Sequence, residues 1–197
     1  MICNTKEIKY KFQIDNKSSK EFIVGENTQK QKALPYWAKL EFNKCPKCSL
    51  EQYQFCPAIN GNIELLEYFS NSKSYDEVKV IAENIEKNTS LENALSSIFS
   101  VSMLASDCPV LGSFKNIACS FLPFLTYDVL LSSITGCDEF SDNKSIIASI
   151  DGVRETLKIL CRRIGSFSNG DANKNALTRL DSYFMRIKAH LESARDK

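Results

Sequence analysis

Histidine is almost missing from this chain, and several familiar active sites are excluded with it. His190 is the only histidine among 197 residues. A Ser-His-Asp triad or a Cys-His pair needs an imidazole beside its nucleophile, whereas we expect His190 to interact with the dipole at the end of a terminal helix. Glycine is also scarce, with seven residues, and these form no phosphate-binding loop or dinucleotide fingerprint.

Long apolar runs are lacking as well. No segment approaches the ~18 to 20 uninterrupted apolar residues of a membrane span. Residues 1–9 alternate charged and apolar side chains where a signal peptide has an apolar stretch. We therefore expect a cytoplasmic protein without a membrane partner. The formal net charge of +1 gives no general attraction to polyanions, so nucleic acid is not an expected partner.

Alternating side chains predict strands in the first part of the chain. Ile8, Tyr10 and Phe12 alternate with polar residues, and residues 21–24 resume an extended pattern after a polar turn. This predicts an antiparallel hairpin. Residues 39–42 predict a further short strand, and residues 78–82 predict the last one.

Helical patterns dominate the second part. Thr89 and Glu92 have the spacing of a capping box, and they predict the start of a helix that ends near Asp107. A further helix or a broken pair of helices is predicted through residues 114–121, and residues 138–144 are expected to form a surface loop.

The clearest pattern is a pair of long amphipathic helices at the C-terminal end. Their apolar residues recur at spacings of three and four, and a short Gly- and Ser-containing loop separates them. This predicts an antiparallel αα-hairpin, and an apolar face left exposed on it would favour a homo-oligomer. The apolar positions are Ile146, Ile150, Val153, Leu157, Leu160 and Ile164, then Leu177, Leu180, Phe184, Ile187 and Leu191.

The fold class that follows is α+β. A small N-terminal antiparallel sheet with a Cys-rich loop precedes a helical bundle that ends in the long hairpin. We expect a single domain over residues 1–197, with a β-rich part at 1–88 and a helical part at 89–197.

Eight cysteines are a surplus in a protein whose thiols are expected to stay reduced. Cys45 and Cys48 have a two-residue spacing that lets one tight loop present both sulfurs to the same point. Cys56 follows in the same segment. Cys108 is our choice for a fourth ligand, because a proline follows it as a proline follows Cys45 and Cys56.

Three interpretations of these four cysteines remain open. The first is a structural metal site, most simply zinc, or an iron–sulfur cluster. The second is a redox dithiol formed by Cys45 and Cys48, and the third is four ordinary buried thiols. Buried thiols are the expected state of the remaining cysteines, which are Cys3, Cys119, Cys137 and Cys161.

A basic cluster on the first hairpin helix is a weaker candidate site. Lys158, Arg162 and Arg163 lie within two turns and would suit phosphate. Glu155 is adjacent, however, so we interpret the cluster as solvated surface.

The segments around the cysteines resemble an uncharacterised bacterial protein family. Its pattern is Cys-Pro-x-Cys, then Cys-Pro, then Cys-Pro-Val, seen here at residues 40–50, 55–60 and 106–110, with further similarity at residues 89–97 and 171–177. No activity is established for that family, so the resemblance implies little about function.

The leading hypothesis is therefore a non-enzymatic binding or regulatory protein whose fold is locked by a thiolate-bound zinc ion at Cys45, Cys48, Cys56 and Cys108. The alternative is a thiol-redox enzyme, or an iron–sulfur or redox sensor, that uses the same cysteines. The sequence assigns no catalytic residue and no specific partner.

Overall fold

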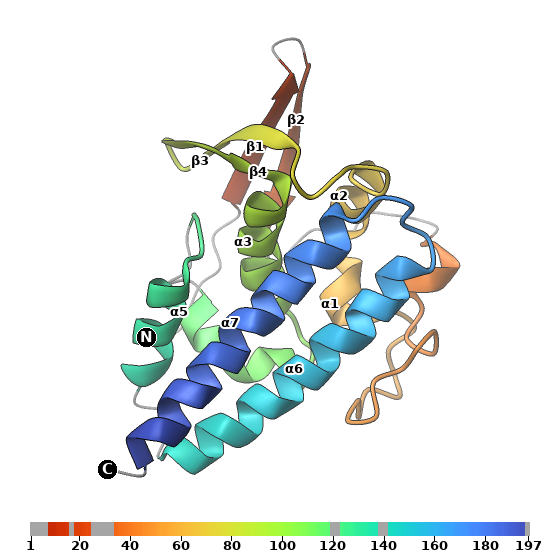
Figure 1. Ribbon diagram of the computed structural model, residues 1–197. Coiled ribbons are helices and arrows are strands. Elements are labelled where there is room, and N and C mark those ends of the chain that lie inside the picture. Colours follow the sequence, from red (N-terminus) through yellow and green to blue (C-terminus); the bar gives the residue numbers. More distant parts are fainter. Residues whose placement is uncertain (1–7, 16–17, 25–33, 119–122, 138–141, 196–197) are drawn as a thin grey trace.

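A four-stranded antiparallel sheet caps one end of a set of helices (Figure 1). The computed structural model describes residues 8–15, 18–24, 34–118, 123–137 and 142–195. The strand order is β2-β1-β3-β4, and every neighbouring pair is antiparallel. The strands are β1 (Ile8–Asp15), β2 (Ser18–Val24), β3 (Glu77–Ala82) and β4 (Ile85–Ser90).

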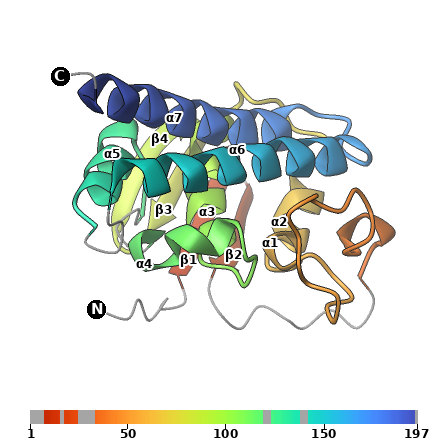
Figure 2. The ribbon, with the colours of Figure 1, turned by 90° about the horizontal axis from the view of Figure 1, so that it is seen from below.

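Helices make up most of the rest. In order they are η1 (Tyr36–Ala38), α1 (Pro57–Asn60), α2 (Ile63–Tyr68), α3 (Leu91–Leu104), η2 (Leu111–Phe114), α4 (Lys115–Ala118), α5 (Tyr127–Thr135), α6 (Asn143–Gly165) and α7 (Ala172–Arg195). Helix α7 packs against both α6 and α3, and α6 and α7 run side by side in opposite directions (Figures 1 and 2). The α+β class, the N-terminal sheet and the long αα-hairpin are thus confirmed.

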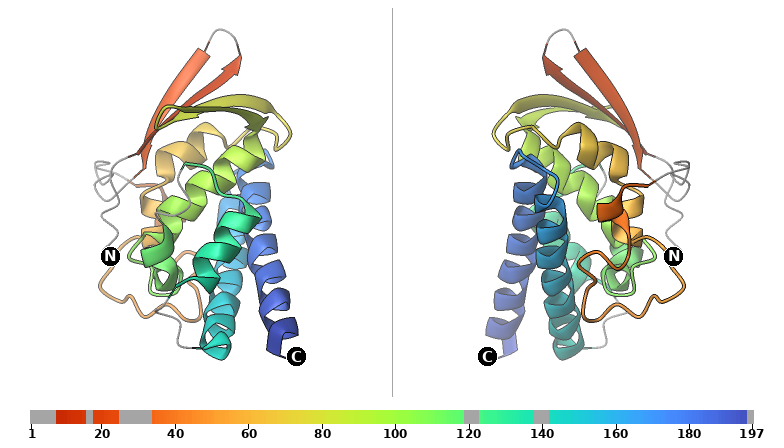
Figure 3. Two further views of the ribbon diagram at one scale, coloured as in Figure 1. Left: turned by 90° about the vertical axis from the view of Figure 1, so that its left-hand side faces the viewer. Right: turned by 90° about the vertical axis from the view of Figure 1, so that its right-hand side faces the viewer.

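The first hairpin forms as the alternation predicts. Ile8 pairs with Val24 and Tyr10 with Phe22, and all four side chains are buried. Figure 3 shows this hairpin projecting beyond the helices, with the rest of the sheet lying across their ends. The alternation succeeds because one face of the sheet packs on the core while the other is solvated.

The prediction that residues 78–82 form the last strand is wrong, because β4 follows directly. Ala82 pairs with Ile85 across a two-residue loop, and both loop residues, Glu83 and Asn84, have positive φ. Such turns match the twist of paired strands. Strand β4 escaped notice because residues 85–88 are all exposed, so no alternation marks it.

The predicted strand at residues 39–42 is also wrong. Only Lys39 makes a β-bridge, with Phe55, and the chain from there to Cys56 is otherwise irregular. Trp37 stacks on Phe167 of the loop after α6 with ring centroids 3.9 Å apart. This aromatic contact fixes the start of the irregular segment against the hairpin.

Helix boundaries differ from the predictions at several points. Ser90, and not Thr89, caps α3 by accepting a hydrogen bond from the Asn93 N–H, and α3 ends at Leu104. Of the helix or broken pair predicted over 114–121, the described residues form the broken arrangement, with η2 followed by α4, and residues 119–122 lie outside the described residues. The loop predicted at 138–144 ends earlier than expected, because Asp142 caps α6, which begins at Asn143. Residues 138–141 lie outside the described residues.

The apolar stripes of α6 and α7 are buried within one chain. All eleven of the predicted positions are buried, so these residues are not the exposed face that a homo-oligomer would use. Oligomerisation itself stays a prediction. Among the described residues, no helix combines the length and apolarity that crossing a membrane requires.

The loop between α6 and α7 docks on the loop between α2 and β3. The Gly170 N–H donates to the Ser70 carbonyl at 2.7 Å, and the Asp171 carboxylate accepts from the Ser74 N–H at 2.8 Å. A Cβ on Gly170 would lie 2.2 Å from the Ser72 carbonyl oxygen. The loop therefore has no room for a side chain there.

We expect Gly170→Ala to lower the free energy of unfolding by about 1–3 kcal/mol, because backbone atoms must move to admit the methyl group. Gly165→Ala is the matched control, since a Cβ there makes an ordinary 3.7 Å contact with the Lys174 side chain. Urea denaturation of both variants tests this. Equal effects would contradict the close docking of the two loops.

Tyr10 provides a second test of the packing. Its ring is fully buried, and its hydroxyl donates to the Pro123 carbonyl at 3.0 Å. Burial, helped by the negative charge of Glu83, raises the pKa of Tyr10 well above its ordinary value. The folded state therefore holds this proton at pH values where the unfolded chain has lost it.

We expect Tyr10 to make the protein less stable in alkali. Its contribution is intact below pH ~10, the ordinary tyrosine pKa, and is lost as the pH rises from there towards the raised pKa. Tyr10→Phe should cost about 1 kcal/mol at pH 7 through the lost hydrogen bond, and should flatten the decline above pH ~10. Denaturation from pH 7 to 11 measures both effects, with the exposed Tyr75→Phe as control. Parallel declines for Tyr10→Phe and wild type would contradict the burial.

Candidate functional site

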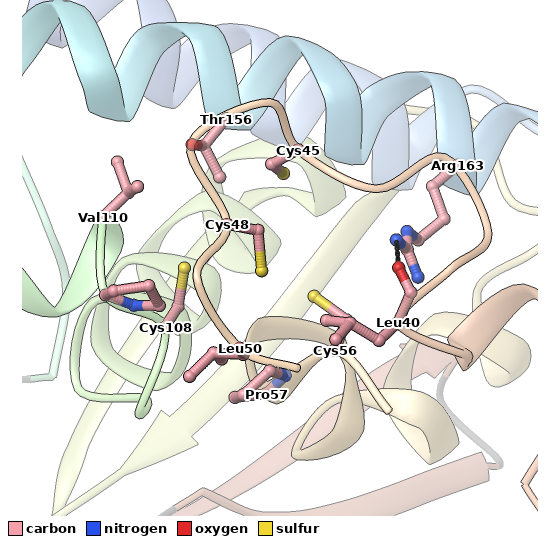
Figure 4. Close-up of a pocket in the computed structure, with 11 residues that line it drawn as sticks. Leu40, Cys45, Cys48, Leu50, Cys56, Pro57, Cys108, Val110, Thr156 and Arg163 are labelled. Carbon is pink, nitrogen blue, oxygen red and sulfur yellow. Dashed lines mark hydrogen bonds between the residues drawn. The ribbon is translucent and has the colours of Figure 1, made fainter. Parts of the chain in front are cut away.

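The four predicted cysteines line one pocket, although Cys108 lies far from the other three in the sequence (Figure 4). Cys45 and Cys48 come from the irregular loop, Cys56 precedes α1, and Cys108 precedes η2. The cavity has a volume of about 10 Å³, which accommodates about one water-sized occupant. The other lining residues are Leu40, Leu50, Pro57, Pro109, Val110, Thr156 and Arg163.

Local backbone geometry aims the thiols. The Cys48 N–H donates to the Cys45 carbonyl at 3.0 Å, which closes a tight turn around the two-residue spacer. Cys56 is the N-cap of α1, with Pro57 at the first helical position, where the missing proline N–H is not needed. In Figure 4 the sulfurs of Cys48, Cys56 and Cys108 turn towards a common space.

The surroundings raise the pKa of three pocket thiols, those of Cys45, Cys56 and Cys108. Burial raises the pKa of Cys45 to about 12, and the neighbouring thiols of Cys56, Cys108 and Cys48 add to the increase. Burial also raises the pKa of Cys56 and of Cys108. The positive charge of Arg163 opposes the increase at Cys56, and nearby backbone N–H groups oppose it at both positions. A redox thiol needs a depressed pKa, so the raised pKa of Cys45 runs against a redox role for that thiol.

Arg163 is the functional residue that the sequence reasoning missed. Its side chain is 1% exposed, so its assignment to solvated surface was wrong, whereas Lys158 and Arg162 are indeed exposed. The available signal was its spacing: Arg163 lies seven residues after Thr156 and three after Leu160, on the edge of the apolar stripe. Helical rotation therefore separates it from Arg162.

The guanidinium of Arg163 holds the chain that leads into Cys45. Nη1 donates to the carbonyl oxygens of Trp37 at 3.1 Å and Lys39 at 2.5 Å. Nη2 donates to those of Leu40 and Asn43, each at 3.3 Å. In the part of the chain that the structure describes, no carboxylate pairs with this cation, and its buried Nε has no hydrogen-bond partner.

The thiols share a pocket without forming a coordination sphere. Across the described residues, no group of three or more His, Cys, Asp or Glu side chains is placed to hold a metal ion, and the four pocket cysteines are free. Tetrahedral zinc needs each sulfur about 2.3 Å from one point. A metal would therefore have to draw the sulfurs together.

The other residues considered from the sequence lie away from the pocket lining. Cys137 and Cys161 are half-buried, and Cys161 faces the Lys174 carbonyl on α7 at 3.6 Å. Cys3 and Cys119 lie outside the described residues. His190 is exposed on α7.

Comparison with known protein families matches residues 5–133 to a domain of unknown function, DUF6901. The chain belongs to this family. The resemblance to a family without an assigned function is thus confirmed. The DUF6901 match includes all four pocket cysteines and ends before α6, so Arg163 lies outside it. Searches of curated proteins and of solved structures found no match.

Alkylation rates test the redox interpretation. Because the thiolate is the nucleophile, we expect Cys45, Cys56 and Cys108 to react with iodoacetamide at pH 8 at least about tenfold more slowly in the native protein than in urea. Cys137, which is half-buried and outside the pocket, serves as the internal reference. Mass spectrometry of timed samples gives the rates. A pocket cysteine that reacts faster in the native protein would favour a redox thiol.

Proposed function

We propose that Cys45, Cys48, Cys56 and Cys108 bind one structural zinc ion, in a protein that binds or regulates a partner and has no catalytic activity. One observation carries this proposal: thiols from two stretches far apart in the sequence line a single pocket beside a buried arginine that pairs with no carboxylate among the described residues. Sulfur ligands suit zinc, and four thiolates would supply the negative charge that the site otherwise lacks.

The size of the cavity favours one ion over a cluster. The cavity of about 10 Å³ would need a smaller rearrangement to hold one ion than to hold an iron–sulfur cluster, which adds several iron and sulfide atoms between the same ligands. An iron–sulfur centre at these cysteines is therefore the second choice. Zinc also has no redox chemistry, and its binding would require each of the four thiols to lose its proton.

Metal binding requires a local closure, and the fold permits it at the right place. Cys45 and Cys48 lie on a loop whose residues from 45 to 54 form no helix or strand. Cys56 and Cys108 are anchored by the turns that follow them. The loop would move towards these two cysteines, and the free energy of metal binding would become free energy of folding.

The lining of the pocket argues for a structural role. Apart from the thiols, Thr156 and Arg163 are its only polar residues, so no carboxylate or imidazole is available for acid–base catalysis. A zinc ion there would clamp the irregular loop to α1, to the turn before η2 and to α6. The surface of that loop would then be held in one shape for a partner.

The test is metal analysis combined with a cysteine substitution. The protein, purified without affinity metal, should contain one zinc per chain and no visible absorption. Cys48→Ser should lose that zinc and at least about 3 kcal/mol of stability, which lowers the Tm by about 6–12 °C for a chain of this size. Plasma emission spectrometry and calorimetry give these values.

Cys137→Ser is the control, because Cys137 lies outside the pocket, and it should keep both zinc and Tm. Iron with visible absorption would favour the cluster instead. A metal-free protein whose Tm is unchanged by Cys48→Ser would overturn the proposal and leave ordinary buried thiols.

A further inference from the structure

Arg163 is a buried cation whose charge nothing described nearby neutralises. Four backbone carbonyl oxygens accept its hydrogen bonds, but carbonyl groups carry only partial charge. Removing a guanidinium from water costs several kcal/mol unless an opposite charge compensates. Its unpaired Nε adds a buried donor without an acceptor. Four neutral thiols supply no negative charge, so the positive charge of Arg163 is not balanced.

Metal binding at the adjacent thiols would complete it. A divalent ion replaces one proton on each of four thiols, which gives a centre of net charge −2 and releases four protons. Arg163 lines the same pocket as all four sulfurs, and its positive charge would then face a negative one at short range. Phe42 lies on another side of the guanidinium, with its ring centroid 5.9 Å from Cζ.

We propose that Arg163 is the counter-ion of the metal–thiolate centre and that it makes the docking of residues 36–43 depend on metal occupancy. This inference rests on the proposed zinc site. The same guanidinium that would face the thiolates holds the carbonyls of Trp37, Lys39, Leu40 and Asn43. With metal bound, Coulomb attraction keeps Arg163 in place, and the segment stays on α6.

Without metal the guanidinium loses its compensating charge. Hydration by water would then be more favourable for it than its hydrogen bonds to residues 36–43. The segment presents Tyr36 and Lys39 at the surface. Loss of the metal would therefore change the surface formed by residues 36–43, which lies at a distance from the thiols. Such a response to metal would be regulatory, whereas a purely structural zinc site has none.

Amide hydrogen exchange measures the coupling between metal occupancy and the docking of residues 36–43. Several amides of the segment make backbone hydrogen bonds, among them Ala38 to Pro35, Lys39 to Tyr36 and Leu40 to Gln54. In the zinc-loaded full chain we expect these amides to exchange at least about tenfold more slowly than after chelation, while amides of α7 change little. Unchanged exchange of residues 38–42 on chelation would overturn the inference.

Substitutions separate charge from hydrogen bonding. Arg163→Gln keeps a donor but removes the charge, and should weaken Zn²⁺ binding by about 10–100-fold in competition with a chelator, the range for residues that support metal ligands. Arg163→Lys keeps the charge and should lose less than about tenfold. Arg162→Gln is the matched control, because Arg162 is the adjacent, exposed residue, and should bind Zn²⁺ as wild type does.

The possible failures are distinguishable. If wild type binds no Zn²⁺, the proposed function fails first. If wild type binds Zn²⁺ and Arg163→Gln binds it equally well, the zinc site stands and the role of Arg163 is overturned. If Arg163→Gln does not fold, Arg163→Lys and the exchange of wild type with and without zinc still decide.

Discussion

The position of the chain between Tyr36 and Cys56 depends on the buried guanidinium of Arg163. The chain between Tyr36 and Cys56 crosses the side of α6 with almost no regular structure of its own, so its carbonyl groups need donors from elsewhere. Arg163 supplies donors to four of them from a single rigid point. The planar fork suits this role, since it presents several N–H groups in a fixed geometry.

The αα-hairpin makes that anchor rigid. The apolar stripe of α6 is buried against α7, and α7 packs in turn against α3, whose N-terminal end meets the sheet. Arg163 sits just off this stripe, at the end of α6 nearest the loop that docks on Ser70. The cation is thus held by the largest packed unit of the molecule, while the cysteine loop folds against it with few contacts of its own.

If the pocket binds zinc as proposed, the negative charge of its thiolates complements the positive charge of Arg163. Neutral thiols and a charged guanidinium are a poor pair, whereas metal-bound thiolates and a guanidinium are a good one. Membership of DUF6901 assigns no activity. The proposed metal is supported by this charge complementarity and by the pocket that the four cysteines share. It also explains why an irregular loop should lie beside a charged residue in an otherwise apolar setting.

The sequence by itself determined the features that repeat over a short distance. Alternation identified the first hairpin, and three- and four-residue spacing identified α6 and α7, because in each case burial on one face is written into neighbouring positions. It missed β4, whose strand character comes only from pairing with β3, and it misplaced Arg163, which differs from the exposed Arg162 only by a rotation about the helix axis. It proposed that Cys108 joins Cys45, Cys48 and Cys56 in one site, but only the tertiary structure brings these side chains to one pocket. Long-range convergence depends on how the packed helices orient the loops, and no local spacing encodes that orientation.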